Sequence, residues 1–250
     1  MNVIELDLDT DQFGTFSGEK PRTLSQYEAA VAKARLGLTH SGISLGIASE
    51  GAIGTDFQIS LLNSDIELIV FVDLESDLVI AERYRSFEIT AVSREVMHGD
   101  DLNQLLISAD FPHHALIVRT EIEGSTTSIK GITEKNQLID AIEKLSRESD
   151  LKKVIVESDL RAHFSPSRRA NIAKAAELLA ARVAALCPEC QTPGWGRTSY
   201  ELGVPCMDCG LVNGDVVRRE ILGCARCEFK TPGKVIATSL EPARCMECNP

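Results

Sequence analysis

The stretch CPECQTPGWGRTSYELGVPCMDCG, residues 187–210, contains two of the four Cys-x-x-Cys pairs in this 250-residue chain. All eight cysteines lie between residues 187 and 248, as Cys187/Cys190, Cys206/Cys209, Cys224/Cys227 and Cys245/Cys248. Two residues between cysteines let both sulfurs turn toward one point, and two such pairs complete a tetrahedral Zn²⁺ shell. The sequence therefore predicts a small C-terminal double zinc ribbon with two structural Zn²⁺ ions.

Other interpretations of these cysteines compete with zinc. A disulfide framework goes with export, and the N-terminus MNVIELDLDTDQ shows no export signal. A redox Cys-x-x-Cys usually occurs once rather than four times, whereas an iron–sulfur cluster would use the same ligands and stays open. For the zinc sites we expect sequential pairing, the first pair with the second and the third with the fourth. An interleaved arrangement fits the ligand count equally well.

The cysteine-free part of the chain alternates predicted strands and helices. This order indicates an α/β fold with a mixed sheet and flanking helices. Helices are expected at 25–38, 101–109, 134–147 and 166–186, and strands at 3–8, 44–50, 67–74, 78–84, 87–93, 115–121 and 152–157. Ser25 and Glu28 have the spacing of a capping box. We expect an α/β domain at 1–164, a connecting helix at 165–186 and a zinc-ribbon domain at 187–250.

The charge of the chain limits its partners. There are 37 acidic and 26 basic residues, a net charge of −11, so general nucleic-acid binding is disfavoured. No apolar run approaches the roughly 20 residues of a membrane span, and we expect a cytoplasmic protein with no membrane partner. A nucleotide ligand and a protein partner at the zinc ribbons are the two partners that we consider. Trp195 and Tyr200 would be contacts for such a protein partner.

Three polar stretches of the α/β domain are candidates for a binding site. LGIASEGAIG, residues 45–54, brings Ser49 and Glu50 into a glycine-flanked turn, where a carboxylate can meet Mg²⁺. Lys33 lies on the preceding helix. ESDLRAHFSPSRR, residues 157–169, places a cluster that includes Arg161, His163 and Arg168 before a helix N-terminus, which attracts anions. The alternatives are a solvated strand end, a plain helix surface and a structural histidine.

Two resemblances follow from these motifs. DTDQFGTFSGE, ASEGAIG, ESDLRAHFSPSR and the closing CNP resemble an uncharacterised bacterial family of unknown function, over nearly the whole chain. EAAVAKARLG before LGIASEGAIG, with IELIVFVDLES and DLRAHFSPSRRA later, is similar in order to the inosine/xanthosine triphosphate pyrophosphatase fold, which includes the Maf proteins. Those enzymes open with a strand and a small-Asn-x-x-Lys phosphate loop, and this sequence contains no such loop before its first helix.

The second resemblance implies roles for named residues. Glu50 and Asp73 would be catalytic and bind Mg²⁺, and Lys33 would face phosphate. His163 and Arg168 would contact base or phosphate, and the ion would activate water for release of pyrophosphate. The alternative function is a non-enzymatic interaction module that uses its zinc ribbons to bind a protein or nucleic-acid partner.

Overall fold

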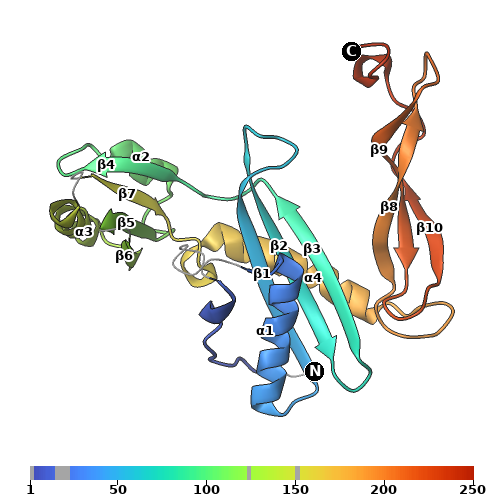
Figure 1. Cartoon of the computed structure of the whole chain (residues 1–250), viewed down its shortest axis with the longest axis horizontal. Helices are drawn as coiled ribbons and strands as arrows, with labels where there is room; N and C mark the ends of the chain where they lie inside the picture. Colours follow the sequence, from blue (N-terminus) through green and yellow to red (C-terminus); the bar gives the residue numbers. More distant parts are fainter. Residues whose placement is uncertain (1–2, 15–22, 123–124, 150–152) are drawn as a thin grey trace. The chain divides into compact units, whose positions relative to one another are not determined.

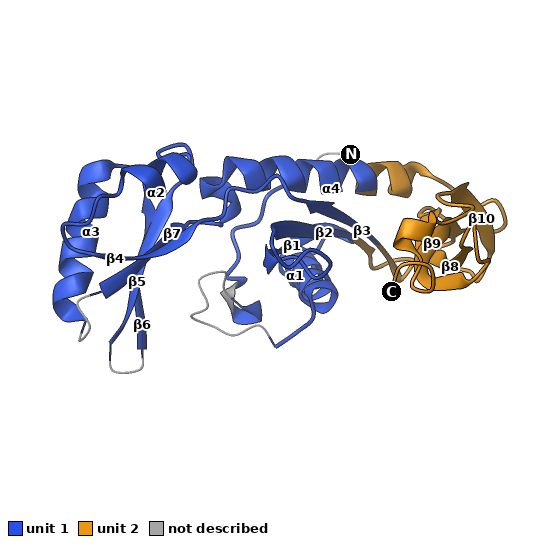
Figure 2. Ribbon diagram, turned by 90° about the horizontal axis from the view of Figure 1, so that it is seen from above, with its two compact units in different colours: residues 1–70, 81–178 blue, residues 71–80, 179–250 orange. Residues whose placement is uncertain are grey.

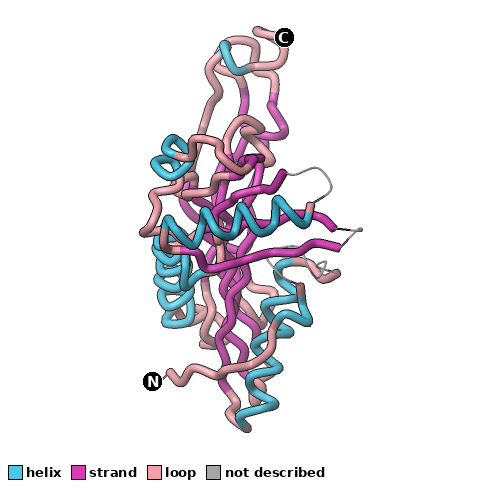
Figure 3. Tube along the Cα trace, turned by 90° about the vertical axis from the view of Figure 1, so that its left-hand side faces the viewer, coloured by secondary structure: helices cyan, strands magenta, loops and turns pink. Residues whose placement is uncertain are grey.

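The computed structural model describes residues 3–14, 23–122, 125–149 and 153–250. In these residues it confirms the mixed α/β class, with four α-helices and three antiparallel sheets (Figures 1 and 3). The chain divides into two compact units (Figure 2). The first unit comprises Met1–Val70 and Ala81–Leu178, and the second comprises Phe71–Ile80 and Leu179–Pro250. The three-part division expected from the sequence stays a prediction.

The first sheet has the strand order β1-β2-β3 and packs against helix α1. Its elements are α1 (Gln26–Ser41), β1 (Leu45–Thr55), β2 (Asn63–Asp73) and β3 (Leu78–Ser86). Helix α1 packs against β1 and buries small residues such as Ala30 and Ala34, which allow a close approach of helix and strand. The apolar run of β2 is buried, with Val70 fully enclosed.

Helix α1 begins with the predicted capping box. The amide N–H of Glu28 donates to Ser25 Oγ at 3.2 Å, and the amide N–H of Ser25 donates to Glu28 Oε2 at 2.9 Å. These bonds satisfy donors that the helix itself leaves unpaired. At the other end the helix stops at Gly42, whose φ of 71° lies in the left-handed region.

Removing this cap gives a first testable effect. We expect Ser25→Ala to lower the free energy of unfolding by about 1 kcal/mol, because the N–H of Glu28 loses its acceptor. Urea unfolding of the purified full chain measures the change. Ser25→Asp keeps an acceptor at the same position and should restore most of the stability. Equal losses in the two variants would contradict a capping role for Ser25.

The second sheet also belongs to the first unit and has the order β4-β7-β5-β6. Its elements are β4 (Ser93–Met97), α2 (Asn103–Ser108), β5 (Leu116–Ile122), β6 (Ser125–Ile132), α3 (Lys135–Glu148) and β7 (Lys153–Ser158). Helix α3 covers this sheet through buried residues that include Leu138 and Leu145. Strands β5, β6 and β7 pair antiparallel, and so do β4 and β7.

Several expected elements differ from the structure. The strand expected at 3–8 is wrong: these residues form no ladder, and Val3 and Ile4 are exposed. The strand expected at 87–93 is also wrong, since β4 begins only at Ser93. Strand β6 was not expected, because its sequence STTSIKGI is largely polar and gives a weak apolar alternation.

Helix α4 (Pro166–Ala184) begins where the sequence predicts it. Ser165 Oγ accepts the amide N–H of Arg168 at 3.4 Å, and Pro166 occupies the first helical position. The amide N–H of Ser167 donates to Nε2 of the buried His114 at 3.2 Å, so a histidine distant in sequence also caps this helix. These contacts fix the segment that holds Arg161 and Arg168.

The third sheet lies in the second unit and has the order β10-β9-β8. Its strands are β8 (Gly196–Pro205), β9 (Val212–Gly223) and β10 (Lys230–Val235), all paired antiparallel. One buried cluster at this sheet contains only Val204 and Leu240 beside the buried Cys206 and Cys245. So small an apolar core gives little stability by itself, and the cysteines are needed to complete the fold.

Candidate functional site

The structure gathers the eight cysteines into two tetrads. One contains Cys187, Cys190, Cys224 and Cys227, and the other contains Cys206, Cys209, Cys245 and Cys248. In each tetrad the four sulfurs lie within 4.8 Å of one another, and the shortest contacts between the two Cys-x-x-Cys pairs are 3.5–3.8 Å. A tetrahedron of sulfurs 2.3 Å from a central ion has edges of about 3.8 Å, whereas a disulfide bond measures about 2.05 Å. Each tetrad can therefore hold one metal ion.

The pairing is interleaved, and the sequential pairing favoured from the sequence is wrong. The first Cys-x-x-Cys pair combines with the third, and the second combines with the fourth. Strand β8 separates the first pair from the second and has ten residues, a length of about 33 Å. Strand β9 then returns antiparallel and brings the third pair back to the end where the first pair lies. The sheet thus has one tetrad at each end.

Hydrogen bonds prepare the sulfurs to bind a cation. The amide N–H groups of Arg226 and Cys227 both donate to Cys224 Sγ at 3.3 Å. Hydrogen bonds from Thr192 lower the pKa of Cys190, in the same tetrad, to about 6. In the same tetrad, burial and hydrogen bonds with neighbouring sulfurs raise the pKa of Cys227 to about 12, so binding of a cation would be needed to hold all four sulfurs as thiolates.

Hydrogen bonds also reach the sulfurs of the second tetrad, where the hydrogen bond with Cys209 and burial raise the pKa of Cys248 to about 12. Backbone hydrogen bonds from Cys248 and Glu247 lower the pKa of Cys245 to about 6. The side-chain amide of the buried Asn213 donates to Cys245 Sγ at 3.8 Å, and the N–H of Asp208 donates to Cys206 Sγ at 3.5 Å. Donors directed at sulfur stabilise its negative charge.

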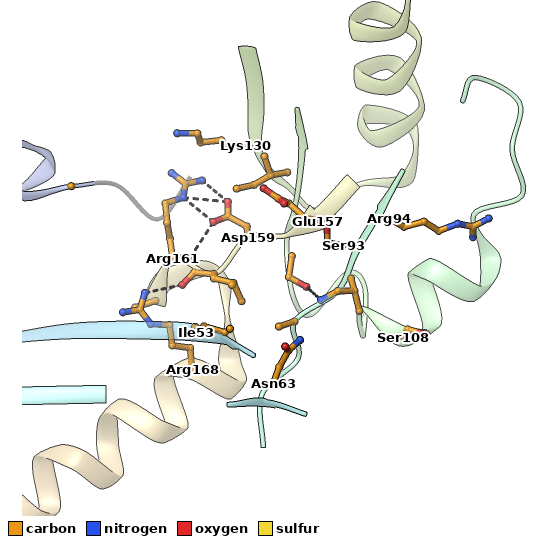
Figure 4. Close-up of a pocket in the computed structure, with 18 of the residues that line it drawn as sticks. Ile53, Asn63, Ser93, Arg94, Ser108, Lys130, Glu157, Asp159, Arg161 and Arg168 are labelled. Atoms are coloured by element: carbon orange, nitrogen blue, oxygen red, sulfur yellow. Dashed lines mark hydrogen bonds and ion pairs between the residues drawn. The ribbon is translucent and has the colours of Figure 1, made fainter. Parts of the chain in front are cut away.

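The first unit contains a cleft of about 930 Å³, lined by polar and charged side chains (Figure 4). Its cationic residues come from five different segments: Lys33 from α1, Arg94 from β4, Lys130 from β6, Arg161 from the loop after β7 and Arg168 from α4. Three carboxylates line it too, those of Glu50, Glu157 and Asp159. The volume lies within the range of small-molecule sites.

Three of these cations form ion pairs in which the carboxylate is the more buried partner. The pairs are Lys33–Glu50, Arg161–Asp159 and Arg168–Glu67. The exposed fractions of the three cationic side chains are 19%, 36% and 7%, against 4%, 0% and 0% for their carboxylates. Lys33 and Arg161 are therefore the more accessible partners of their pairs, whereas Arg168 is buried together with Glu67.

Several contacts fix the Arg161 side chain in the lining of the cleft. Its Nε and Nη2 both donate to the carboxylate of Asp159, and the amide N–H of Gly131 donates to Asp159 Oδ2 at 3.0 Å. The guanidinium lies over the ring of Phe164, 4.7 Å from its centre. Gly131 has φ 72°, and a Cβ there would lie 2.8 Å from the Phe164 ring, so glycine is required. Figure 4 shows the Arg161–Asp159 contact on the wall of the cleft.

Arg168 belongs to a buried polar network behind the cleft. Its Nε donates to Glu67 Oε1 and its Nη1 donates to the carbonyl oxygen of Leu160 at 2.8 Å. Burial raises the pKa of Glu67 to about 7 and also raises that of Asp65, which lies two residues earlier on the same face of β2. Asn171 donates to Asp65 Oδ2 at 2.8 Å. We infer that the two carboxyl groups hold one proton between them and that Arg168 balances the remaining charge.

Five of the residues selected from the sequence line the cleft, namely Lys33, Ser49, Glu50, Arg161 and Arg168. Two do not. Asp73 lies in the second unit at the turn after β2, where it accepts hydrogen bonds from Glu75 and Ser76, and its pKa is lowered chiefly by Ser76. The ring of His163 is exposed and lies against Phe164.

Other lining residues were not selected from the sequence. Lys130 and Arg94 lie on strands whose sequences carry no distinctive motif. Asp65 and Glu67 did leave a signal, because carboxylates at i and i+2 share one face of a strand that leads into a buried apolar run. A pair of this kind needs a buried cation, and Arg168 is that cation.

Together, these features define an α/β protein with a polar cleft and a three-stranded ribbon that has a cysteine tetrad at each end. Residues 33–250 match the family model described as "Domain of unknown function (DUF6671)". The chain belongs to this family, and the resemblance to a family of unknown function is confirmed. No curated protein and no solved structure matches the chain. Among the described residues, no helix has the length and apolar character needed to cross a membrane.

The resemblance to the inosine/xanthosine triphosphate pyrophosphatases is not supported. The strands of this chain form three small antiparallel sheets, and no solved structure of that fold matches them. The Glu50 carboxylate, which that resemblance assigns to Mg²⁺, forms an ion pair with Lys33. The order of short motifs along the sequence does not identify this fold, because many folds contain a helix followed by a strand that ends in an acid.

Proposed function

We propose that the cleft of the first unit binds a small phosphate-bearing ligand, a nucleotide being the class that fits best. The observation that carries this proposal is the exposure of the ion pairs at the cleft, in which Lys33 and Arg161 are more accessible than their carboxylates, while Arg168 is a buried cation in the same lining. The ion pairs already hold these cationic side chains in place. The side chains therefore lose little further conformational freedom when they bind phosphate oxygens. Arg94 and Lys130 add positive charge, and neutral side chains such as Ser49 supply further hydrogen bonds.

Mg²⁺-dependent hydrolysis of a nucleoside triphosphate is the finer function that the sequence suggested. A magnesium ion on Glu50 would have to displace the ammonium group of Lys33. Bound triphosphate would offer Lys33 a replacement partner, which would free the carboxylate for the ion. We propose ligand binding as the function of the cleft, with hydrolysis as a further step that Glu50 would support.

The binding proposal can be tested by calorimetry with ATP, ITP and inorganic pyrophosphate, each with and without Mg²⁺. We expect Arg161→Ala to weaken binding by about ten- to a hundredfold, since a hydrogen bond to a charged group contributes about 1.5–3 kcal/mol. Lys130→Ala removes another cation that lines the cleft and leaves the buried Asp159 paired with Arg161. Arg147→Ala, at an exposed ion pair on α3, is the matched control and should bind as the wild type does.

The alternatives lead to distinct outcomes. Release of phosphate or pyrophosphate that needs Mg²⁺ and disappears in Glu50→Ala would extend binding to hydrolysis. No heat of binding with any of the three ligands, from folded protein, would refute a phosphate site in this cleft. Equal weakening by Arg147→Ala would show that the charge of the whole chain, rather than the cleft, determines binding.

For the tetrads we propose that each holds a structural Zn²⁺ ion. Four thiolates fill a tetrahedral shell and leave no position for a substrate, so the ions would stabilise the ribbon and take no part in chemistry. The sulfur separations of 3.5–3.8 Å suit one ion, and a four-iron cluster needs a wider set of ligands because each sulfur binds a different iron. Metal analysis of protein purified without added zinc gives the identity of the ion.

A further inference from the structure

The two Cys-x-x-Cys pairs of the second tetrad have matching sequences. They read Cys206-Met207-Asp208-Cys209 and Cys245-Met246-Glu247-Cys248, a methionine followed by an acid in both. The pairs of the first tetrad read CPEC and CARC and share no such pattern. Met207 and Met246 are 68% and 73% exposed.

The two methionines lie beside the same tetrad. The four sulfurs of this tetrad lie within 4.8 Å of one another, so both methionines are adjacent to the same site. The amide N–H of Cys206 donates to the carbonyl oxygen of Leu211, which places Leu211 and the next residue, Val212, beside the same tetrad. Both of these residues are exposed. We name Met207, Leu211, Val212 and Met246 the methionine surface.

Acidic groups surround the methionine surface. Residues 206–215 and 240–250 contain four acids, Asp208, Asp215, Glu241 and Glu247, and one basic residue, Arg244, for a net charge of −3. Four thiolates and one divalent ion would add −2. At the opposite end, residues 187–197 and 222–230 contain three basic and two acidic residues, for a net charge of +1. The tetrad at this end would add the same −2, so the two ends would carry −5 and −1 with their ions, and the end with the methionine surface is the more acidic one.

We propose that the methionine surface binds a basic amphipathic peptide segment of a partner protein. Methionine side chains are flexible and polarizable, so they adapt to apolar groups of different shapes. The surrounding carboxylates would pair with lysine or arginine on the same segment and steer its approach. This binding is independent of the cleft and of its ligand.

The same charges argue against other occupants. A second copy of the chain would bring another acidic surface, and the net charge of −11 adds to the repulsion. Anionic lipid and nucleic acid would be repelled for the same reason. Trp195, which the sequence suggested as a partner contact, is half-buried and stacks on Phe229 at 5.5 Å, so it stabilises the ribbon instead. Tyr200 is exposed and contacts Arg197.

The test uses a labelled amphipathic peptide of about 18 residues built from lysine and leucine, with a glutamate/leucine peptide of the same pattern as its control. Fluorescence anisotropy with the metal-loaded full chain should show that the lysine/leucine peptide binds and that the glutamate/leucine peptide does not. We expect Met207→Ser/Met246→Ser and Asp208→Lys/Glu247→Lys each to weaken it by about tenfold or more. All four positions are exposed and bind no metal, so metal content should stay unchanged.

Matched controls lie at the other end of the ribbon. Glu189→Lys/Glu228→Lys makes the same charge change beside the first tetrad at two exposed acids, and Leu186→Ser removes an apolar side chain that is 51% exposed. Both should bind the lysine peptide as the wild type does. Equal weakening by Glu189→Lys/Glu228→Lys would overturn the proposal, because net charge alone would then explain binding. Self-association or binding to anionic vesicles that the methionine variant abolishes would also overturn it.

Discussion

Replacing Cys190 and Cys224 together with serine should leave one metal ion bound with wild-type affinity, whereas replacing Cys190 and Cys209 should leave none. The first variant removes two ligands from a single tetrad and keeps the other tetrad complete. The second variant removes one ligand from each tetrad, so both shells become incomplete. Metal content after dialysis against increasing concentrations of a chelator measures the number of tight sites. Sequential pairing would reverse the two results.

The mirror variant provides the control for this experiment. Cys209→Ser/Cys248→Ser removes two ligands from the second tetrad and should also keep one tight ion. Cys190, Cys209 and Cys248 are exposed, so serine at these positions disturbs little packing. If both same-tetrad variants lose both ions, the two ends of the ribbon fold as one cooperative unit, and the metal count would contradict independent sites.

Full metal removal should have a larger effect on the same segment. Structural zinc contributes about 10–16 kcal/mol of apparent binding free energy in small zinc peptides. The ribbon buries few apolar residues beyond Val204 and Leu240 in its cluster at the second tetrad. We therefore expect chelation to unfold residues 187–250 and to expose them to proteolysis, while the helical signal of the first unit persists.

The sequence predicts those features of this protein that depend on neighbouring residues. Ser25 with Glu28, and Ser165 with Pro166, mark helix starts through contacts within one turn, and both starts are found in the structure. Each Cys-x-x-Cys pair is likewise a local unit. The order in which the pairs combine depends on the direction of β8 and β9, which no local spacing encodes.

For the candidate site too, the sequence predicts individual residues in local motifs but not how the fold brings them together. Lys33 and Glu50 were selected one by one from local motifs, and the structure adds that they form an ion pair at the cleft. Lys130 was missed because β6 has a polar sequence and pairs at a sheet edge. Asp73 was assigned a role only through the resemblance to the pyrophosphatases, and in the structure the chain turns there and the carboxylate caps the turn. Long-range packing, which spacing does not reveal, decides between these outcomes.

Arg168→Met should lower the free energy of unfolding by about 3–5 kcal/mol, the usual cost of leaving one partner of a buried ion pair alone. Methionine fills part of the volume of arginine but leaves Glu67 and Asp65 without their buried cation. Buried side-chain oxygens on both carboxyl groups, Asp65 Oδ1 and Glu67 Oε2, already lack a hydrogen-bond partner in the structure. Denaturant unfolding of the full chain measures the loss, and a loss below about 1 kcal/mol would contradict a central role for this network.

The protonation of Glu67 gives this network a pH dependence with a definite sign. The pKa of Glu67 rises from 4.5 to about 7 on folding, so between these values the folded state holds a proton that the unfolded state has released. The resulting stabilisation is complete below pH 4.5 and is lost as the pH rises through 7, with a slope of up to about 1.4 kcal/mol per pH unit. Glu67→Gln resembles the protonated form and should remove this slope. Its stability relative to the wild type should therefore increase from pH 5 to pH 8.

A matched glutamate separates this effect from the general titration of the chain. Glu121→Gln, at an exposed position on β5, should follow the wild type from pH 5 to pH 8. Arg168→Met should make the slope steeper at neutral pH, because loss of the cation favours protonation of both carboxyl groups in the folded state. If Glu67→Gln and the wild type keep a constant difference over this range, Glu67 is ionised in the folded protein and Arg168 alone neutralises it. The inference that Asp65 and Glu67 share one proton and that Arg168 balances the remaining charge would then be wrong.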